Sequence, residues 1–172
     1  RLGEEIHSLL RVPGSHGEPA NVLRYTEGQY YAAHNDHFPQ QEGDGGRNRL
    51  ATVFVHLAAP KRGGATHFPL AVGAGDPVTV PPPEIVNVRC GESGVKVPSV
   101  EGTSTLFYSL RADGAPDPFS LHAGCPPESG TKWAIANWVW NEAVSDASDP
   151  EATDPDASSF LGWLRTVGRI NT

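Results

Sequence analysis

His34 and Asp36 stand two positions apart in the stretch YYAAHNDHF, which covers residues 30–38. In an extended strand, side chains at positions i and i+2 point to the same side, so an imidazole and a carboxylate with this spacing can approach one cation together. Two protein ligands are too few for a tight metal site, and a third must come from elsewhere. The motif alone is weak because it is so short. A similar His-x-Glu at residues 16–18 lies in a turn-like stretch, and we interpret it as structural.

A second group of candidate residues lies in residues 119–140, FSLHAGCPPESGTKWAIANWVW. His122 offers another imidazole, and Lys132 opens a strand-like run further on. Two histidines and one carboxylate can fill one face of an octahedral iron and leave three positions open. Lys132 begins a strand face of small and aromatic residues, although lysines are rarely buried without an anionic partner. At a strand end, a lysine can also reach solvent.

Together, these residues resemble the iron(II)- and 2-oxoglutarate-dependent dioxygenases, and more narrowly the plant and algal type of prolyl 4-hydroxylase. Three stretches carry the resemblance: VLRYTEGQYYAAHNDHF (22–38), NRLATVFVHLAAPKRGGATHFP (48–69) and GTSTLFYSLRADGAPDPFSLHAGCPPESGTKW (102–133). They cover most of residues 20–140. The resemblance implies that the catalytic iron(II) is bound by His34, Asp36 and His122. It also implies that Lys132 pairs with the distal carboxylate of 2-oxoglutarate.

Three further residues match cosubstrate-binding positions of this family. Tyr25 matches a tyrosine that donates a hydrogen bond to the same carboxylate, Thr66 matches a threonine of that pocket, and Trp138 matches a tryptophan beside the cosubstrate. Ordinary core packing is the alternative for Tyr25 and Trp138. Tyr25 and His34 would face opposite ways on one regular strand, so we expect a turn or bulge at residues 27–28.

The resemblance also suggests residues that bind a proline-containing peptide. Tyr31 and Arg49 match positions associated with this substrate, although Arg49 can also be a surface charge at the start of a strand. Trp140 stands where relatives often carry His or Arg. We therefore expect substrate recognition to differ from that of the collagen enzymes.

The expected activity is peptidyl-proline 4-hydroxylation, coupled to the oxidative decarboxylation of 2-oxoglutarate to succinate and carbon dioxide. Oxygen is consumed, and ascorbate is expected as a further cofactor. Three alternatives remain open: a cytosolic prolyl hydroxylase that regulates oxygen sensing or translation, a non-catalytic peptide-binding module that has kept the pocket, and a zinc site built from the same ligands.

The elements that must position these residues are predicted to be mostly strands. The chain has 19 glycines and 16 prolines in 172 residues, which favours short strands and turns over a helical bundle. Strand-like runs occur at residues 21–25, 29–33, 49–57, 84–88, 103–110 and 132–140. Short helices are expected at residues 4–10 and 159–170. We expect an all-β core with peripheral helices, arranged as a double-stranded β-helix (jelly roll).

The charge distribution suggests a catalytic domain over residues 1–141, an acidic linker over 142–157 and a C-terminal helix over 158–172. The linker holds six acidic residues and no basic one, out of a net charge of −7 for the chain. This charge argues against a nucleic-acid partner, since little would neutralise phosphates. The sequence shows no signal peptide and no membrane span. The domain is expected to lack N-terminal elements that its relatives carry.

Cys90 and Cys125 are the two cysteines of the chain. Composition leaves open whether they are free thiols or a disulfide. In the resembling family a cysteine pair is common at these positions, which suggests a disulfide that would fix the strand carrying His122. A disulfide would place the protein in the secretory pathway, in the endoplasmic reticulum or Golgi lumen, and free thiols would favour the cytoplasm.

Overall fold

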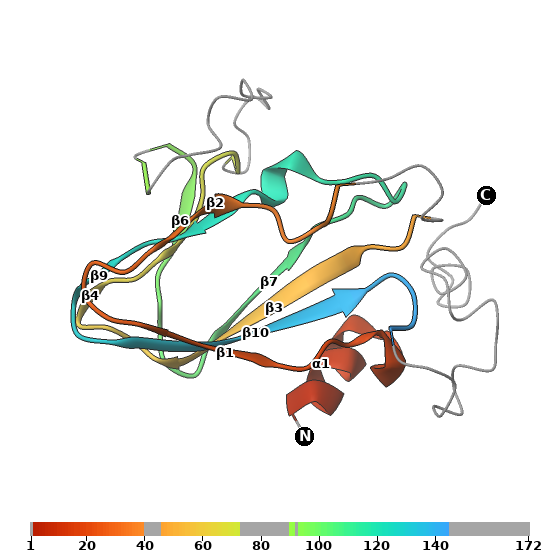
Figure 1. Cartoon of the computed structure of the whole chain (residues 1–172), viewed down its shortest axis with the longest axis horizontal. Coiled ribbons are helices and arrows are strands. Elements are labelled where there is room, and N and C mark those ends of the chain that lie inside the picture. Colours follow the sequence, from red (N-terminus) through yellow and green to blue (C-terminus); the bar gives the residue numbers. More distant parts are fainter. Residues whose placement is uncertain (1, 40–45, 73–89, 92, 145–172) are drawn as a thin grey trace.

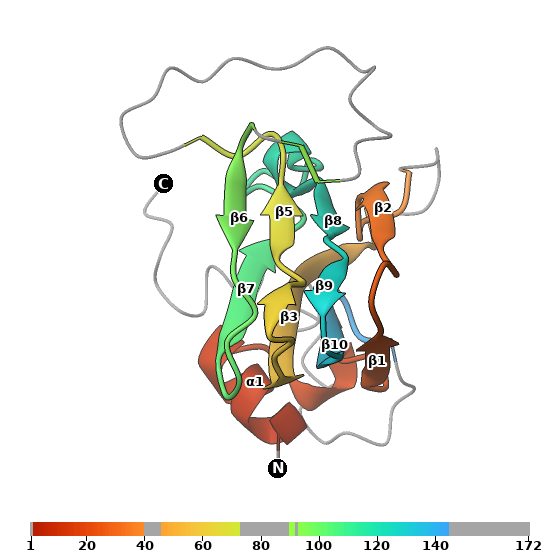
Figure 2. The ribbon, with the colours of Figure 1, turned by 90° about the vertical axis from the view of Figure 1, so that its left-hand side faces the viewer.

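Two antiparallel sheets face each other in the computed structural model, which describes residues 2–39, 46–72, 90–91 and 93–144 (Figure 1). The larger sheet has the strand order β1 (Asn21–Tyr25), β10 (Lys132–Trp140), β3 (Arg49–Ala58) and β7 (Ser104–Tyr108). The smaller sheet has the order β2 (Tyr31–His34), β8 (His122–Gly124), β5 (Thr66–Phe68) and β6 (Val95–Val97), which Figure 2 shows side by side. A short pair, β4 (Arg62–Gly63) with β9 (Pro127–Ser129), completes the strands. The jelly-roll prediction is confirmed.

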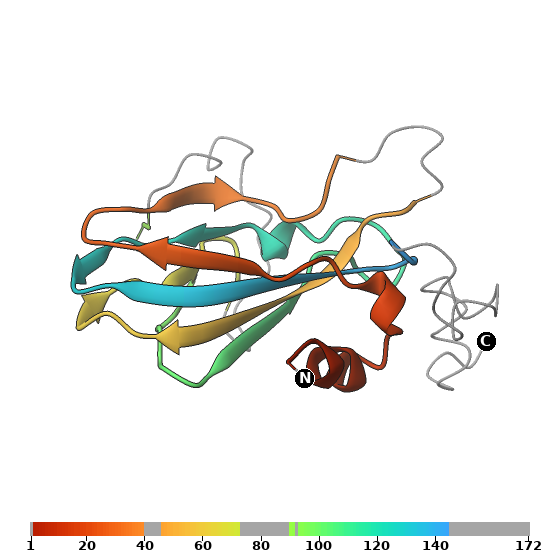
Figure 3. The same ribbon diagram turned by 60° about the horizontal axis from the view of Figure 1, so that its bottom comes forward.

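Strand β10 lies at the centre of the larger sheet because it pairs with β1 on one side and β3 on the other (Figure 3). Its side chains alternate between the two faces of the sheet. Lys132, Ala134 and Ala136 are buried on the face toward the smaller sheet, whereas Trp133 is 40% exposed on the other face. Small alanine side chains in the middle of this strand leave room between the two sheets.

The helix α1 (Leu2–Leu10) covers one end of the outer face of the larger sheet, as Figures 1 and 3 show. Its apolar residues Ile6 and Leu10 are buried in one cluster with Ala51, Val53 and Val139. A 3-10 turn, η1 (Gly14–His16), follows α1, and a second one, η3 (Pro118–Ser120), precedes β8. No helix in the described part of the chain is both long and apolar enough to span a membrane.

A turn carries the chain from the larger to the smaller sheet between β1 and β2. Gly28 adopts a φ of 78°, a left-handed conformation that glycine accepts without strain, and its N–H donates to the Pro127 carbonyl at 3.0 Å. The Gln29 N–H donates to the Thr26 carbonyl at 3.1 Å and closes the turn. The turn expected at residues 27–28 is therefore confirmed, and it allows Tyr25 and His34 to line the same cavity.

Most predicted elements coincide with observed ones. The runs at 21–25 and 132–140 match β1 and β10, and those at 29–33, 49–57 and 103–110 differ from β2, β3 and β7 by one or two residues at their ends. The predicted strand at 84–88 and helix at 159–170 lie outside the described residues. The same is true of the predicted C-terminal helix over 158–172 and of the acidic linker from residue 145 onward.

Candidate metal and cosubstrate site

The pairing of β2 with β8 places two histidines next to each other. His34 is the last residue of β2 and lies directly opposite His122, the first residue of β8. Their ring centroids are 4.3 Å apart. The strand ends at His34, and Asp36 lies in the bend that follows, so the expectation of a strand through both residues is wrong in this detail. The bend nevertheless returns the Asp36 carboxylate to within 3.5 Å of His34 Nε2 and 3.7 Å of His122 Nε2.

Hydrogen bonds to the backbone orient both imidazoles. The Nδ1 atom of His34 lies 2.9 Å from the Ala32 carbonyl, and Nδ1 of His122 lies 2.9 Å from the Ser120 carbonyl. A carbonyl oxygen only accepts, so each Nδ1 carries a proton and each ring turns its Nε2 toward the Asp36 carboxylate. Burial lowers the pKa of His122, which keeps that ring neutral. Both Nε2 atoms are therefore ready to bind a metal.

Asp36 supplies the negative charge of the cluster. Burial by itself raises the pKa of this carboxyl, but its interactions with His34, His122 and Thr52 outweigh burial and lower the pKa to about 2. The Thr52 hydroxyl, on β3, donates to Asp36 Oδ2 at 2.5 Å. Asp36 is 6% exposed and stays ionised at neutral pH.

The three side chains fit a divalent transition metal. One ligand atom from each of His34, Asp36 and His122 lies within 4.8 Å of the others, and no other such group of three exists among the described residues. Two imidazole nitrogens and one carboxylate oxygen match the 2-His-1-carboxylate arrangement of non-haem iron(II) sites. Phe107 packs on the His122 ring at 4.6 Å between centroids, and Tyr31 on the His34 ring at 4.0 Å, which limits rotation of both rings.

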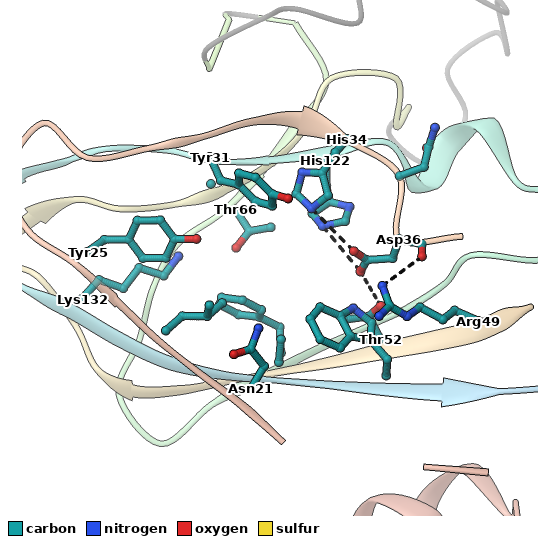
Figure 4. Close-up of a pocket in the computed structure, with 16 residues that line it drawn as sticks. Asn21, Tyr25, Tyr31, His34, Asp36, Arg49, Thr52, Thr66, His122 and Lys132 are labelled. Carbon is teal, nitrogen blue, oxygen red and sulfur yellow. Dashed lines mark hydrogen bonds and ion pairs between the residues drawn. The ribbon is translucent and has the colours of Figure 1, made fainter. Parts of the chain in front are cut away.

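Lys132 lies at the other end of the same cavity, which has a volume of about 400 Å³ (Figure 4). The side chain is 1% exposed, so the alternative that it reaches solvent is wrong. Its Nζ donates to the Gly64 carbonyl at 2.7 Å, and no described carboxylate lies within ion-pair distance. Burial lowers the pKa of Lys132 to about 8. A buried ammonium without an anion points to an anionic ligand that binds in the cavity.

The other predicted cosubstrate residues lie on the walls between these two ends. Tyr25 lies beside Lys132 in Figure 4, with the Lys132 Nζ 5.9 Å from the centre of its ring. Thr66 and Trp138 also line the cavity. Thr66 Oγ1 and Trp138 Nε1 are buried atoms without a hydrogen-bond partner. Such atoms cost free energy unless a ligand or water satisfies them, so they add two polar groups to the lining of the binding cavity.

Two of the three predicted peptide-binding residues, Tyr31 and Arg49, line the cavity, and Trp140 pairs with Arg49 across β10 and β3. Tyr31 is 54% exposed next to His34. Arg49 lines the cavity from the start of β3 and contacts the Trp138 ring at 4.0 Å, so it is not an isolated surface charge. Trp140 stacks on Phe38 with ring centroids 5.7 Å apart. Tyr31 and Arg49 therefore line the same cavity as the metal-binding cluster, and Trp140 lies next to Arg49.

Two residues that position the cluster were missed by the sequence reasoning. Thr52 carries no motif, and its role follows only from the position of β3 beneath Asp36. Asn48 is 1% exposed and binds both backbone groups of Phe38: its Oδ1 accepts from the N–H at 2.8 Å, and its Nδ2 donates to the carbonyl at 2.9 Å. A polar residue directly before a buried strand is a weak signal, because most such residues are solvated.

Cys90 and Cys125 come together at the distance of a disulfide, with Cα atoms 5.6 Å apart. Cys125 directly follows β8, and its N–H donates to the Ala65 carbonyl at 2.8 Å. The pair connects the strand of His122 to a segment that is 35 positions earlier in the sequence.

Known proteins are related to the chain by sequence. The family model of the 2OG-Fe(II) oxygenase superfamily matches residues 20–140. Prolyl 4-hydroxylase 2 of Arabidopsis thaliana is 37% identical over 139 residues, which is 80% of this chain and 46% of the relative. Probable prolyl 4-hydroxylase 4 of the same plant is 36% identical over 174 residues, covering 97% of the chain and 56% of the relative. The chain thus spans about half the length of these curated relatives.

Solved structures show the same architecture. The viral collagen prolyl hydroxylase of Paramecium bursaria Chlorella virus-1 superposes with a TM-score of 0.61 at 26% identity, covering 84% of this chain and 67% of that one. A second structure of the viral enzyme, in complex with 2OG, superposes with a TM-score of 0.55 at 25% identity, covering 81% and 69%.

We predict that Thr52→Val weakens divalent-metal binding by about tenfold, because it removes the hydrogen bond that holds the Asp36 carboxylate and helps to lower its pKa. Isothermal titration with cobalt(II) measures the effect. Thr52→Ser keeps the hydroxyl and should bind like the parent. Thr103→Val removes an exposed hydroxyl that donates to Val100 and serves as the control. Equal affinities for all four proteins would show that Thr52 has no part in the site.

Proposed function

The chain belongs to the 2OG-Fe(II) oxygenase superfamily, and from this premise we propose that it hydroxylates peptidyl proline at C4. The reaction is coupled to the oxidative decarboxylation of 2-oxoglutarate to succinate and carbon dioxide. One observation carries the proposal: a carboxylate with two imidazoles lies at one end of a cavity, and a buried lysine lies at its other end. The prolyl 4-hydroxylases among its relatives support proline as the target.

His34, Asp36 and His122 would hold iron(II) through their two Nε2 atoms and one carboxylate oxygen. When bound, iron(II) with 2-oxoglutarate would activate O2, which is the oxidant: one oxygen atom would go to proline C4 and the other to succinate as carbon dioxide leaves. The protein fixes three ligands on one side, which leaves the remaining positions for the cosubstrate and oxygen. The backbone hydrogen bonds of both rings preserve this geometry.

Lys132 would bind the distal carboxylate of 2-oxoglutarate. The anion would raise the pKa of Lys132 toward its ordinary value, because the buried charge would then be paired. Tyr25 and Thr66 have hydroxyl groups on the wall of the same cavity and would complete the binding of that carboxylate. Trp138 would pack beside the cosubstrate and restrict the access of water.

Tyr31, Arg49 and Trp140 would bind the peptide at the opening of the cavity. An exposed tyrosine and a tryptophan stacked on Phe38 offer flat apolar surfaces that suit proline rings. Ascorbate would keep the iron reduced between turnovers. The cysteine pair favours an oxidising compartment such as the lumen of the endoplasmic reticulum or Golgi.

We expect turnover of at least one peptide in a panel of poly-proline, Ser-Pro repeats and Pro-Pro-Gly repeats. Mass spectrometry would show the gain of one oxygen atom on proline, with an equal amount of succinate. His122→Ala should lose both signals, because it removes a metal ligand. Peptide binding without succinate formation in the presence of iron(II) would show a binding module. Peptide cleavage with zinc in place of iron(II) would point to a hydrolase.

Lys132→Met should raise the KM for 2-oxoglutarate by about a hundredfold, because it removes the partner of the distal carboxylate and keeps a similar volume. Steady-state kinetics measure this change, with the exposed Lys96→Met as the control. A KM for 2-oxoglutarate that stays within twofold of the parent would contradict the role of Lys132.

The same substitution should not destabilise the ligand-free protein. The folded-state pKa of Lys132, about 8, lies below its ordinary value, so the burial penalty is fully present below pH 8. The penalty is relieved as pH rises from about 8 toward 10.5, and the parent gains roughly 3 kcal/mol over that range. Urea unfolding of Lys132→Met should lack this rise with pH, whereas Lys96→Met should retain it.

Purified, unreduced protein should contain a disulfide between Cys90 and Cys125. Alkylation without reductant should then leave the mass of the intact chain unmodified, and alkylation after reduction should add two labels. Two labels without reductant would show free thiols and would favour the cytoplasmic alternative.

A further inference from the structure

We infer that Glu18 is a positioning residue that holds Arg49 and Trp140 in the arrangement that receives the peptide. The inference rests on the proposed function of the cavity, and it concerns a residue that lies outside residues 20–140, the region matched by the family model. Glu18 belongs to the segment between η1 and β1, which is far from the metal-binding motifs in sequence.

The Glu18 carboxylate binds a cation and an indole at once. Its Oε1 atom accepts a hydrogen bond from Arg49 Nε at 2.5 Å and another from Trp140 Nε1 at 2.6 Å. Its Oε2 atom accepts from Arg49 Nη2 at 2.8 Å. A two-point contact between guanidinium and carboxylate fixes orientation as well as distance. The Glu18 and Arg49 side chains are only 21% and 17% exposed, so solvent screens the pair weakly.

The backbone around Glu18 is anchored to the end of β10. The Glu18 N–H donates to the Trp138 carbonyl at 3.0 Å, and Gly17 forms a bridge with Val139. The His16 ring contacts the Trp140 carbonyl through Nδ1 at 3.0 Å. Residues 16–18 therefore act as a short extension of the larger sheet. The fold itself determines where the carboxylate lies.

Arg49 and Trp140 then form one surface beside the metal-binding cluster. The Arg49 guanidinium lies between the Phe38 ring, at 4.9 Å, and the Trp138 ring, at 4.0 Å. Its Nη1 atom donates a long hydrogen bond of 3.4 Å to the Asp36 carbonyl, which Figure 4 shows as a dashed line. Trp140 stacks on the same Phe38 ring, with ring centroids 5.7 Å apart.

This arrangement determines what the two residues can offer a peptide. Arg49 forms a net-neutral pair with Glu18 through its Nε and Nη2 atoms, and its Nη1 atom is bound to the Asp36 carbonyl, so few of its donors remain free for an acidic group. The indole N–H of Trp140 is also occupied, so the ring can contribute only stacking. Both features suit an uncharged proline ring better than an acidic side chain. Glu18 thereby selects for a neutral, proline-rich segment at this surface.

The test uses variants of Glu18 with two independent readouts. Glu18→Gln keeps one acceptor oxygen but loses the charge and one hydrogen bond to Arg49, Glu18→Ala loses all three contacts, and Glu18→Asp keeps a shorter carboxylate. Glu128→Gln is the matched control, because Glu128 pairs with Arg62 at 3.8 Å where both side chains are about two-thirds exposed. The first readout is the nuclear magnetic resonance signals of the Trp140 indole N–H and the Arg49 Nε–H. The second is KM for the peptide.

Glu18→Gln should move both resonances and raise the peptide KM about tenfold, and Glu18→Ala should raise it further. KM for 2-oxoglutarate and the iron affinity should stay within about threefold, and Glu18→Asp should restore part of the peptide affinity. A general structural defect would instead change the peptide KM, the KM for 2-oxoglutarate and the iron affinity together. Unchanged resonances, or an unchanged peptide KM in Glu18→Ala, would overturn the inference. If the parent hydroxylates no proline peptide, the proposed function fails, and the resonances still decide whether Glu18 holds the two side chains.

Discussion

The register between β2 and β8 is the constraint on which the site depends. His34 and His122 are far apart in the sequence, and only their direct pairing across two short strands brings both Nε2 atoms to one carboxylate. A shift by one residue would turn one ring to the outer face of the sheet. The outer face resists such a shift, because Ala33, Leu121 and Ala123 are buried there in a common cluster. The ring contacts of His122 with Phe68 and Phe107 add to the same restraint.

The cavity contains two buried charged side chains, and the protein stabilises the charge of only one of them well. Asp36 is ionised at low cost, because two imidazoles and the Thr52 hydroxyl surround it. Among the described residues, Lys132 Nζ has one hydrogen-bond acceptor, the Gly64 carbonyl, and no carboxylate partner, and burial lowers its pKa to about 8. Gly64 can present this carbonyl because it has a φ of 74°, and an added Cβ would lie 2.6 Å from Pro60. The carboxylate at one end of the cavity has its hydrogen-bond partners, whereas the lysine at the other end lacks an anionic partner among the described residues. Such a cavity is suited to an anionic cosubstrate that reaches from the metal to the lysine.

The sequence was sufficient to predict the strands with strong alternation or β-branched residues. Strands β1 and β10 have the predicted bounds, because residues that favour strands, such as Val22, Tyr25, Ile135 and Val139, lie between clear turn residues. Strands β5 and β8 were not predicted, since three residues are too few for a periodic pattern. His122 was nevertheless assigned through the resemblance to a known family. Its neighbour across the sheet could not have been inferred from local sequence, because strand pairing is a non-local property.

The supporting residues were harder to predict than the ligands. Asn48 and Thr52 act through hydrogen bonds to the segment that carries Asp36, and their spacing in the sequence follows no motif. Glu18 was interpreted as structural, and its contacts with Arg49 and Trp140 show how much a structural residue can determine at the mouth of a site. Such contacts depend on how separate strands meet, which only the folded chain reveals.

A crystal structure of the protein prepared without oxygen, with iron(II) and 2-oxoglutarate, tests the central claim most directly. The account predicts an anomalous iron signal at bonding distance from Nε2 of His34, Nε2 of His122 and one oxygen of Asp36, with the distal carboxylate of 2-oxoglutarate paired to Lys132. Iron bound elsewhere, or a cosubstrate carboxylate remote from Lys132, would contradict it.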